Sequence, residues 1–291
     1  MNFLNPTEVI LNYVEAGKKK AERPLGKMIL LAILAGMLIA FGGVVSNTAV
    51  HAIQNLGVAR LVSGLVWPIG LAIVMLLGGE LFLGNTMMVV SVLDKKTNLR
   101  ALLKNWFFVY LGNLFGGLTI SAMIAASGQL RLNEGSLAIF TIKTAVNKVS
   151  MGFGAAVLMG ILCNLLVCAA VLCSSTAKDT AGRIMGAYIP IFYFITGGFE
   201  NAVANMYLAP VGIFALKVPE YAQHANAIGI DTSVLTWGNI FAQNLLPVTI
   251  GNIIGGVAIG VIMWCGHLQP HRREATDIAL RKGLSGASEA L

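Results

Sequence analysis

The chain has 291 residues, of which 56% are hydrophobic and 11% are charged, and its formal net charge is +7. A soluble globular domain carries about a quarter charged residues, so this composition excludes water as the main solvent of the chain. The basic residues lie between apolar runs too long for a soluble core, which makes anionic lipid a better partner for them than nucleic acid. The four cysteines lie inside apolar runs without a CxxC pair and are interpreted as small buried hydrophobes.

Residues 1–27 are expected to form a cytoplasmic N-terminal segment with one amphipathic helix. Asn5 supplies an N-cap, Pro6 suits the first helical position, and Glu8 places an acid in the first turn. The apolar residues of this helix share one face: Val9, Ile10, Tyr13 and Val14. Two roles are open, of which we favour the first: the helix lies on the lipid surface, or it covers the cytoplasmic mouth of a pore.

Six apolar runs reach the length of about 20 residues that is needed to cross hydrocarbon. They cover residues 28–50, 61–93, 105–127, 151–174, 184–214 and 237–265. We therefore expect an all-α membrane protein with six transmembrane helices in a channel domain over residues 28–266. The polar residues 267–291 are expected to form a cytoplasmic tail.

The second and fifth runs are longer than one crossing requires. The second contains Gly-Gly-Glu ending at Glu80, and the fifth contains Gly-Gly-Phe-Glu ending at Glu200. Glycine pairs followed by polar residues at membrane depth indicate helices that are broken near the membrane centre.

The two halves of the chain carry a repeated motif. Residues 112–117 read GNLFGG in the third run, and residues 251–256 read GNIIGG in the sixth. Because each half has three spans, repeats over about 28–127 and 151–265 must cross the bilayer in opposite directions. The GNxxGG motifs can mark this inverted repeat, serve close helix packing through glycine, or do both.

The distribution of Lys and Arg predicts the orientation. Fifteen of the 20 lie in the N-terminal segment, the second and fourth connections and the C-terminal tail. Since cytoplasmic segments carry the positive excess, both termini are predicted to be cytoplasmic, with the protein in the inner cell membrane.

Glu80 and Glu200 are the acids that fall inside predicted spans. They can belong to an ion pathway, or they can accept hydrogen bonds from backbone N–H groups that the breaks leave free. We favour the second role, because fixed negative charges would repel an anion. The N-terminus of each half-helix carries a partial positive charge and favours anions instead.

Lys148 adds a full positive charge just before the fourth span. It can attract an anion into a funnel, or it can be an ordinary flanking lysine that reaches the membrane interface. Asn164, inside the fourth span, can orient this lysine or join two helices. The remaining candidate lining is apolar and favours a species neutralised by a proton: Leu71, Leu81, Phe82, Val167 and Phe194. No nucleotide, nucleophile or zinc motif indicates an enzyme, a metal or a cofactor.

Several motifs together are typical of one known family. Residues 76–82 read LLGGELF, residues 160–170 read GILCNLLVCAA, and residues 246–256 read LPVTIGNIIGG. From about residue 5 to 266 the chain resembles the formate/nitrite transporter family of formate, nitrite and hydrosulfide channels. The resemblance implies an aquaporin-like protomer in a homopentamer, each protomer with its own pore. It also implies that the five apolar lining residues form constrictions and that Lys148 with Asn164 forms an anion-attracting pair.

Two positions depart from the pattern of that family. Leu83 stands where the family usually has threonine, and Asn201 where it usually has histidine. In the family these side chains face each other across a central chamber. Leu83 cannot hydrogen-bond and Asn201 cannot titrate as histidine does, so a mechanism that relies on that histidine is in doubt. Either a natural subfamily or engineered substitutions can produce this pattern.

The sequence therefore predicts a channel or proton-coupled transporter for a small monovalent anion: formate, nitrite or hydrosulfide. A neutral-solute pore for water or ammonia is the main alternative, because apolar constrictions permit it. A membrane scaffold without transport is a third hypothesis, which intramembrane glycines and polar breaks disfavour.

Overall fold

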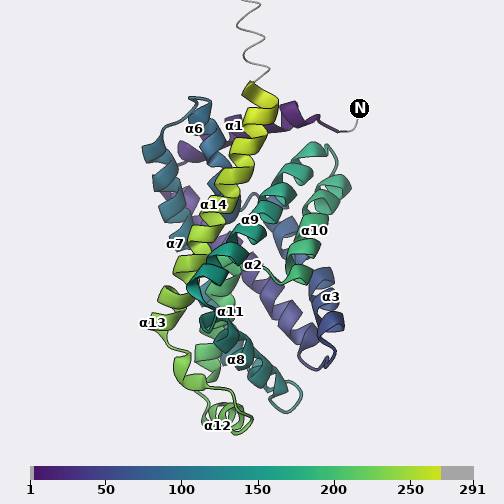
Figure 1. Cartoon of the computed structure of the whole chain (residues 1–291), viewed down its shortest axis with the longest axis vertical. Helices are drawn as coiled ribbons and strands as arrows, with labels where there is room; N and C mark the ends of the chain where they lie inside the picture. Colours follow the sequence, from purple (N-terminus) through teal and green to yellow (C-terminus); the bar gives the residue numbers. More distant parts are fainter. Residues whose placement is uncertain (1–2, 270–291) are drawn as a thin grey trace, which may run out of the picture.

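A computed structural model describes residues 3–269, which form helices connected by short loops (Figure 1). The predicted tail lies mostly outside the described residues. The long helices are α1 (Pro6–Ala21), α2 (Leu25–Val50), α7 (Leu99–Ser127), α8 (Ser136–Val149), α9 (Phe153–Thr176), α10 (Thr180–Gly197), α11 (Ala202–Ala215) and α14 (Leu246–Met263). The shorter ones are α3 (Leu56–Val66), α4 (Pro68–Leu76), α5 (Phe82–Asn85), α6 (Val89–Leu93), α12 (Pro219–Ala227) and α13 (Trp237–Asn239).

Within residues 3–269, five helical segments are long and apolar enough to cross a membrane. They are Leu25–Val50, Leu56–Leu76, Leu99–Ser127, Phe153–Thr176 and Trp237–Leu268. A sixth candidate combines α11 with α12, which are bent by 100° against each other. The last segment includes two π-helical stretches, Ile240–Leu245 and Trp264–Leu268. The described part of the chain is therefore an all-helical membrane protein of five to six apolar spans.

Glycines allow the long helices to approach closely in both halves. A Cβ at Gly116 of α7 would lie 2.3 Å from the carbonyl oxygen of Ile33 in α2. A Cβ at Gly255 of α14 would lie 2.5 Å from the carbonyl oxygen of Ile161 in α9. Because backbone atoms cannot move away as a flexible side chain can, the glycines of both GNxxGG motifs are required for helix packing.

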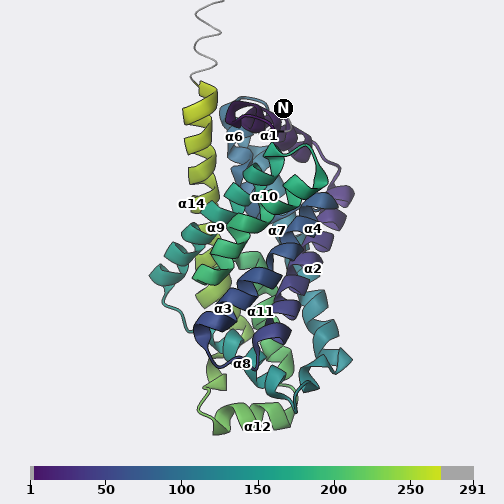
Figure 2. The ribbon, with the colours of Figure 1, turned by 90° about the vertical axis from the view of Figure 1, so that its right-hand side faces the viewer.

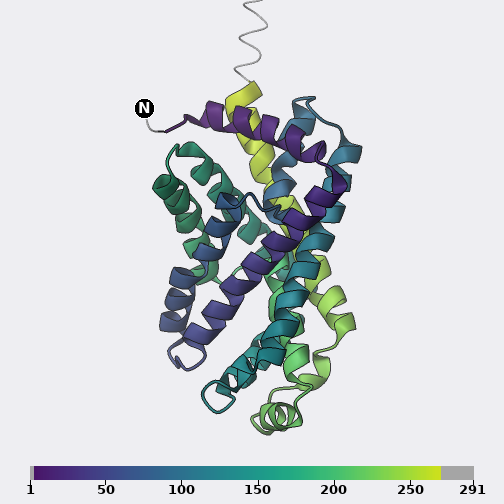
Figure 3. The same cartoon turned by 180° about the vertical axis from the view of Figure 1, so that it is seen from behind.

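The N-terminal helix α1 begins as the sequence predicts and packs against the rest of the protein. Asn5 and Glu8 form a reciprocal capping box at its start. Its apolar face is buried in a cluster with residues of α6, α9 and the C-terminal π-helix: Val90, Cys168, Leu172 and Leu268. The expectation that this face lies on lipid is therefore wrong, because the protein itself covers it. Figure 3 shows α1 crossing one end of the helix bundle.

Four predicted cytoplasmic segments lie at the same end of the molecule. Phe3 pairs with Ala177 in an isolated antiparallel bridge, which joins the N-terminal segment to the loop between α9 and α10. Lys96, in the loop between α6 and α7, forms an ion pair with Glu15 of α1 at 3.1 Å. The end of α14 lies beside them, whereas α12 lies at the opposite end (Figures 1 and 2). The basic connections therefore face one side.

The cysteines differ from one another in exposure. Cys163 and Cys168 are buried as the sequence predicts, but Cys173 and Cys265 are exposed. The interpretation of all four as buried hydrophobes is wrong for these two, because their helix faces point away from the bundle.

Candidate functional site

The first helix interruption lies between α4 and α5. Helix α4 ends at Leu76, residues 77–81 follow, and α5 begins at Phe82. The Phe82 N–H donates to Oδ1 of Asn113 at 2.9 Å, and Nδ2 of Asn113 donates to the Glu80 carbonyl at 2.9 Å. The same Nδ2 donates to the carbonyl of Ala32 at 2.7 Å. Asn113, the asparagine of the first GNxxGG motif, thus ties the interruption to two long helices.

The second interruption repeats this arrangement between α10 and α11. Gly198 ends α10 with φ +73°, a left-handed conformation that suits glycine. The Ala202 N–H donates to Oδ1 of Asn252 at 2.9 Å, and Nδ2 of Asn252 donates to the carbonyls of Glu200 at 3.0 Å and Gly160 at 2.8 Å. The GNxxGG motifs therefore supply hydrogen bonds to both interruptions in addition to close packing.

The asparagines also change the interpretation of the interrupted helices. The first N–H of α11 is bonded to Asn252, and the Ala204 N–H donates to the side chain of Asn201 at 3.0 Å. These two N–H groups are satisfied by asparagine side chains. They are therefore not free to bind an anion, which was the role expected for the N-terminus of a half-helix. The expectation that the Glu80 and Glu200 carboxylates accept these N–H groups is wrong, because asparagine side chains do so.

The carboxylates of Glu80 and Glu200 instead accept from cationic and amide side chains. Glu80 is 1% exposed and contacts Nζ of Lys20 at 2.9 Å and the guanidinium of Arg23. Glu200 is 2% exposed and forms an ion pair with the ammonium of Lys148. A buried carboxylate requires such compensation, because its transfer from water is costly.

Amide side chains complete the environment of each carboxylate. Asn85 donates to Glu80 at 2.6 Å and to Asn105 at 2.8 Å. In the other half, Asn205 donates to Glu200 at 2.7 Å and to the side chain of Asn244 at 2.8 Å. The two interruptions are therefore built from the same residue types.

Lys20 is the counterpart of Lys148, although the sequence pattern indicates a pathway role only for Lys148. Nδ2 of Asn105 donates to the carbonyl of Lys20 at 3.4 Å, and Nδ2 of Asn244 donates to the carbonyl of Lys148 at 2.9 Å. Each lysine thus offers its carbonyl to an asparagine and its ammonium to a glutamate. Arg23 has no such counterpart, because within residues 3–269 Lys148 is the one cation that forms an ion pair with Glu200.

Asn164 joins helices rather than orienting Lys148. Its Nδ2 donates to Oγ1 of Thr86 at 2.9 Å and to the carbonyls of Leu83 at 3.3 Å and Asn252. Of the two roles expected for Asn164, the structure therefore supports the joining of helices. The partner that holds the Lys148 ammonium is Glu200.

A cavity opens beside each ion-paired glutamate. The cavity at the α1 end has a volume of about 270 Å³, and its lining includes Lys20, Arg23, Glu80, Leu71 and Leu81. The cavity at the α8 end has a volume of about 370 Å³, and its lining includes Lys148, Glu200, Asn201, Phe194 and Trp67. We call them the α1-side vestibule and the α8-side vestibule.

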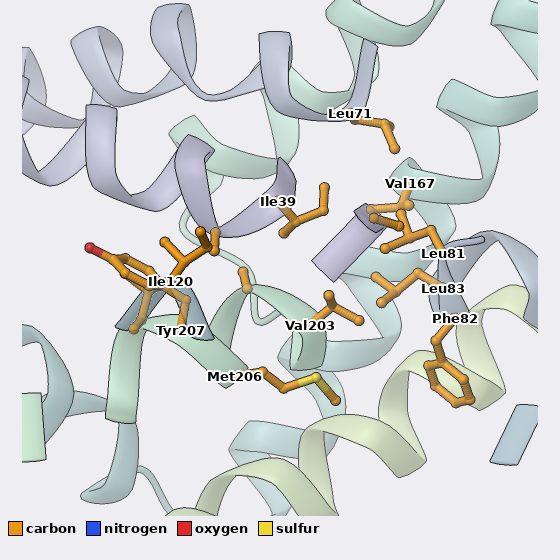
Figure 4. Packing of buried hydrophobic residues seen from close by; sticks show 14 of the residues in the cluster. Ile39, Leu71, Leu81, Phe82, Leu83, Ile120, Val167, Val203, Met206 and Tyr207 are labelled. Carbon is orange, nitrogen blue, oxygen red and sulfur yellow. The ribbon is translucent and has the colours of Figure 1, made fainter. Parts of the chain in front are cut away.

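Buried apolar side chains gather around the interruptions. Leu71, Leu81, Leu83, Val167 and Phe194 belong to one hydrophobic cluster, and each is at most 5% exposed. Figure 4 shows Leu71, Leu81, Leu83 and Val167 close together, near Ile39 and Val203. Three of these residues line a vestibule. Leu71 and Leu81 line the α1-side vestibule, and Phe194 lines the α8-side vestibule. The cluster forms an apolar block at the centre of the protein.

Phe82 points away from this group. Its ring centroid lies 5.0 Å from that of Tyr110 and 6.3 Å from that of Trp106, both in α7. In Figure 4 the ring extends away from Leu81 and Leu83. Phe82 lines neither vestibule, so its observed contacts are those of aromatic packing behind the first interruption.

The two unusual positions differ in their surroundings. Leu83 is fully buried in the apolar block, whereas Asn201 caps α11 and lines the α8-side vestibule. The side chain at position 201 therefore borders a cavity, whereas the side chain at position 83 is part of the apolar block.

Comparisons with known proteins agree with this architecture. Residues 7–265 match the formate/nitrite transporter family. The chain is 36% identical over 265 residues to the formate channel FocA of Haemophilus influenzae, covering 89% of this chain and 93% of that protein. It is 35% identical over 287 residues to a probable formate transporter of Methanothermobacter thermautotrophicus, covering 92% and 98%. A solved pentameric formate channel with formate bound has a TM-score of 0.75 and 33% identity, covering 86% of this chain and 99% of that chain.

Proposed function

This chain belongs to the formate/nitrite transporter family, and from this premise we propose that it is a membrane channel for formate and similar small monovalent anions. The observation that carries the proposal is the pair of vestibules, each with a lysine ion-paired to a buried glutamate, on either side of an apolar block. Nitrite and hydrosulfide are further candidate substrates, because they are small anions with the same charge.

The proposed architecture has six membrane spans in two inverted repeats. Spans two and five are α3 to α6 and α10 to α11, each interrupted near the membrane centre. The matching hydrogen bonds of Asn113 and Asn252 support this assignment. The channel domain covers residues 28–266, between an N-terminal segment and a C-terminal tail.

The proposed orientation places both termini in the cytoplasm of a cell whose inner membrane holds the protein. The basic connections gather at the α1 end, which is consistent with the positive-inside rule. By analogy with the pentameric formate channel, we propose that five copies assemble and that each copy has its own pore.

In the proposed pathway, the anion enters a vestibule beside a cation and then meets the apolar block. Lys148 and Asn201 are among the polar groups that face it at the α8 end, as are Lys20 and Arg23 at the α1 end. Leu71, Leu81 and Phe194 separate the vestibules, with Leu83 and Val167 behind them. A bare anion is poorly solvated there, so formate crosses this region partly or wholly as its neutral acid.

Transport by the purified protein in liposomes tests this function. We expect formate flux above that of protein-free liposomes and no flux of glycerol. A pH series with formate, nitrite and hydrosulfide would identify the preferred anion, and a rise of flux at lower pH would support passage as the neutral acid. Water or ammonia flux without anion flux would replace the proposal with a neutral-solute pore, and zero flux of every solute would leave a scaffold.

A further inference from the structure

A third cavity, larger than either vestibule, lies next to the α8-side vestibule. Its volume is about 690 Å³, and it is bounded by α3, by α8 and by the residues that connect α2 to α3. Three basic side chains line it: His51, Arg60 and Lys143. We call this cavity the outer basin.

The outer basin has basic side chains and no acidic one in its lining. His51 Nδ1 lies 2.8 Å from the carbonyl oxygen of Thr48, so this nitrogen is the donor. The other ring nitrogen, Nε2, is buried without a hydrogen-bond partner among the described residues. The basic side chains favour an anionic ligand, and Nε2 of the neutral His51 ring can accept a hydrogen bond from the O–H of a protonated acid.

Arg60 borders the basin and the vestibule together. It lines both cavities, as do Ser63, Thr144 and Asn147. Its guanidinium lies against Gly198 at the second helix interruption, where an added Cβ would overlap Nη1. Within residues 3–269 the Arg60 guanidinium forms neither an ion pair nor a hydrogen bond, in contrast to the Lys148 ammonium. The guanidinium is thus available to a ligand.

We infer that the outer basin is an anion-binding site that precedes the α8-side vestibule. Its ligand is a small carboxylate or another small oxoanion, held by Arg60 and Lys143 and passed along Arg60 into the vestibule. The Lys148 charge is compensated by Glu200, so the uncompensated cations of the basin supply the attraction at this end. This inference rests on the proposed function and adds a site of binding to it.

Formate flux into liposomes as a function of formate concentration tests the inference. Arg60→Gln and Lys143→Gln should each raise the half-saturating concentration by roughly two- to five-fold for entry from the α8 end, because each removes one charge beside the ligand. Entry from the α1 end should keep its half-saturating concentration. Lys217→Gln is the matched control, because Lys217 lies over the ring of Phe214 and does not line the basin.

Each outcome is decisive. An unchanged half-saturating concentration in Arg60→Gln and Lys143→Gln would overturn the site, and so would an equal rise in Lys217→Gln, which would indicate general surface charge. The wild-type protein is measured first: absence of formate flux there would contradict the proposed function itself rather than the outer basin. Equal thermal unfolding temperatures of the variants would exclude misfolding at the Gly198 contact.

Discussion

Lys20 and Lys148 occupy equivalent positions in the two halves of the chain. Each ammonium pairs with the glutamate of a helix interruption, and each main-chain carbonyl accepts a hydrogen bond from an asparagine. The equivalence extends the repeat beyond the membrane spans, because it makes α1 the counterpart of α8. The surroundings of the two carboxylates differ among the described residues: two cations contact Glu80, whereas one contacts Glu200.

Removal of the Lys148 charge should lower anion flux and stability together. Lys148→Gln leaves the buried Glu200 carboxylate uncompensated, which repels an anion from the vestibule. Because Lys148 is 18% exposed, the loss of stability should be about 1–3 kcal/mol, below the ~3–5 kcal/mol of a fully buried pair. Formate flux and thermal unfolding in detergent measure both effects.

The double variant Lys148→Gln with Glu200→Gln separates charge from folding. It removes the unpaired carboxylate, so the unfolding temperature should recover. Recovery of flux to the wild-type level would mean that the lysine serves only to neutralise the glutamate and does not attract anions.

Arg23 should favour anion entry from the α1 end. Arg23→Gln leaves Glu80 paired with Lys20, so stability should change by less than about 1 kcal/mol. The half-saturating formate concentration at the α1 end should rise roughly two- to five-fold, because the vestibule loses its excess charge. Lys27→Gln is a control from the same end that does not line this vestibule. An identical shift in both variants would count against a specific role of Arg23.

The asparagines of the GNxxGG motifs should be needed for the shape of the interruptions. Asn252→Leu removes the acceptor of the Ala202 N–H and the donor to two carbonyls, at a cost of about 1–3 kcal/mol for each buried group left unpaired. Asn113→Leu should cost a similar amount, because its hydrogen bonds match. The unfolding temperatures of both variants measure this loss of stability. A lower unfolding temperature in only one of the two variants would contradict the structural equivalence of the two asparagines.

Asn201→His should give formate flux a pH dependence. Position 201 lines the α8-side vestibule, and an imidazole there gains a positive charge as the pH falls through about 6.5. Flux should therefore rise below this pH more steeply than in the wild type. Asn201→Gln is the non-titrating control, and the same pH profile in both variants would exclude a titrating role for this position.

The phenol of Tyr13 should link the stability of α1 to alkaline pH. Its hydroxyl donates to the Gly84 carbonyl at 2.6 Å, and burial raises its pKa well above the ordinary value. Below pH ~10 the phenol is neutral in both folded and unfolded chains, so its contribution is complete there. Above that pH the unfolded chain loses the proton first, and the unfolding temperature should fall. Tyr13→Phe should show a smaller alkaline fall.

The helices and the motifs of the two interruptions were accessible from sequence, whereas most side-chain partners were not. The length of an apolar run and the presence of a glycine pair are local features of the sequence. The glycine pairs before Glu80 and Glu200 therefore predict where helices end. The partners of Glu80 lie 57 and 60 residues away, in a basic cluster that sequence alone assigns to membrane orientation. Nothing in their spacing distinguishes Lys20 and Arg23 from the lysines beside them.

Asn164 illustrates the same limit. A buried amide has several donors and acceptors, and sequence does not determine which distant carbonyl it meets. Its bonds to Thr86 and Leu83 connect α9 to the opposite half of the chain, 78 and 81 residues away.

The docking of α1 has a consequence for truncation experiments. A chain shortened by its first 23 residues would lose both cations that contact Glu80, together with the side chains that cover Val90 and Leu172. Altered conductance of the shortened protein could then result from the unpaired Glu80 carboxylate and from the newly exposed apolar surface at Val90 and Leu172. Experiments that ask whether α1 covers the mouth of the pore therefore need point substitutions in α1 that preserve Lys20 and Arg23.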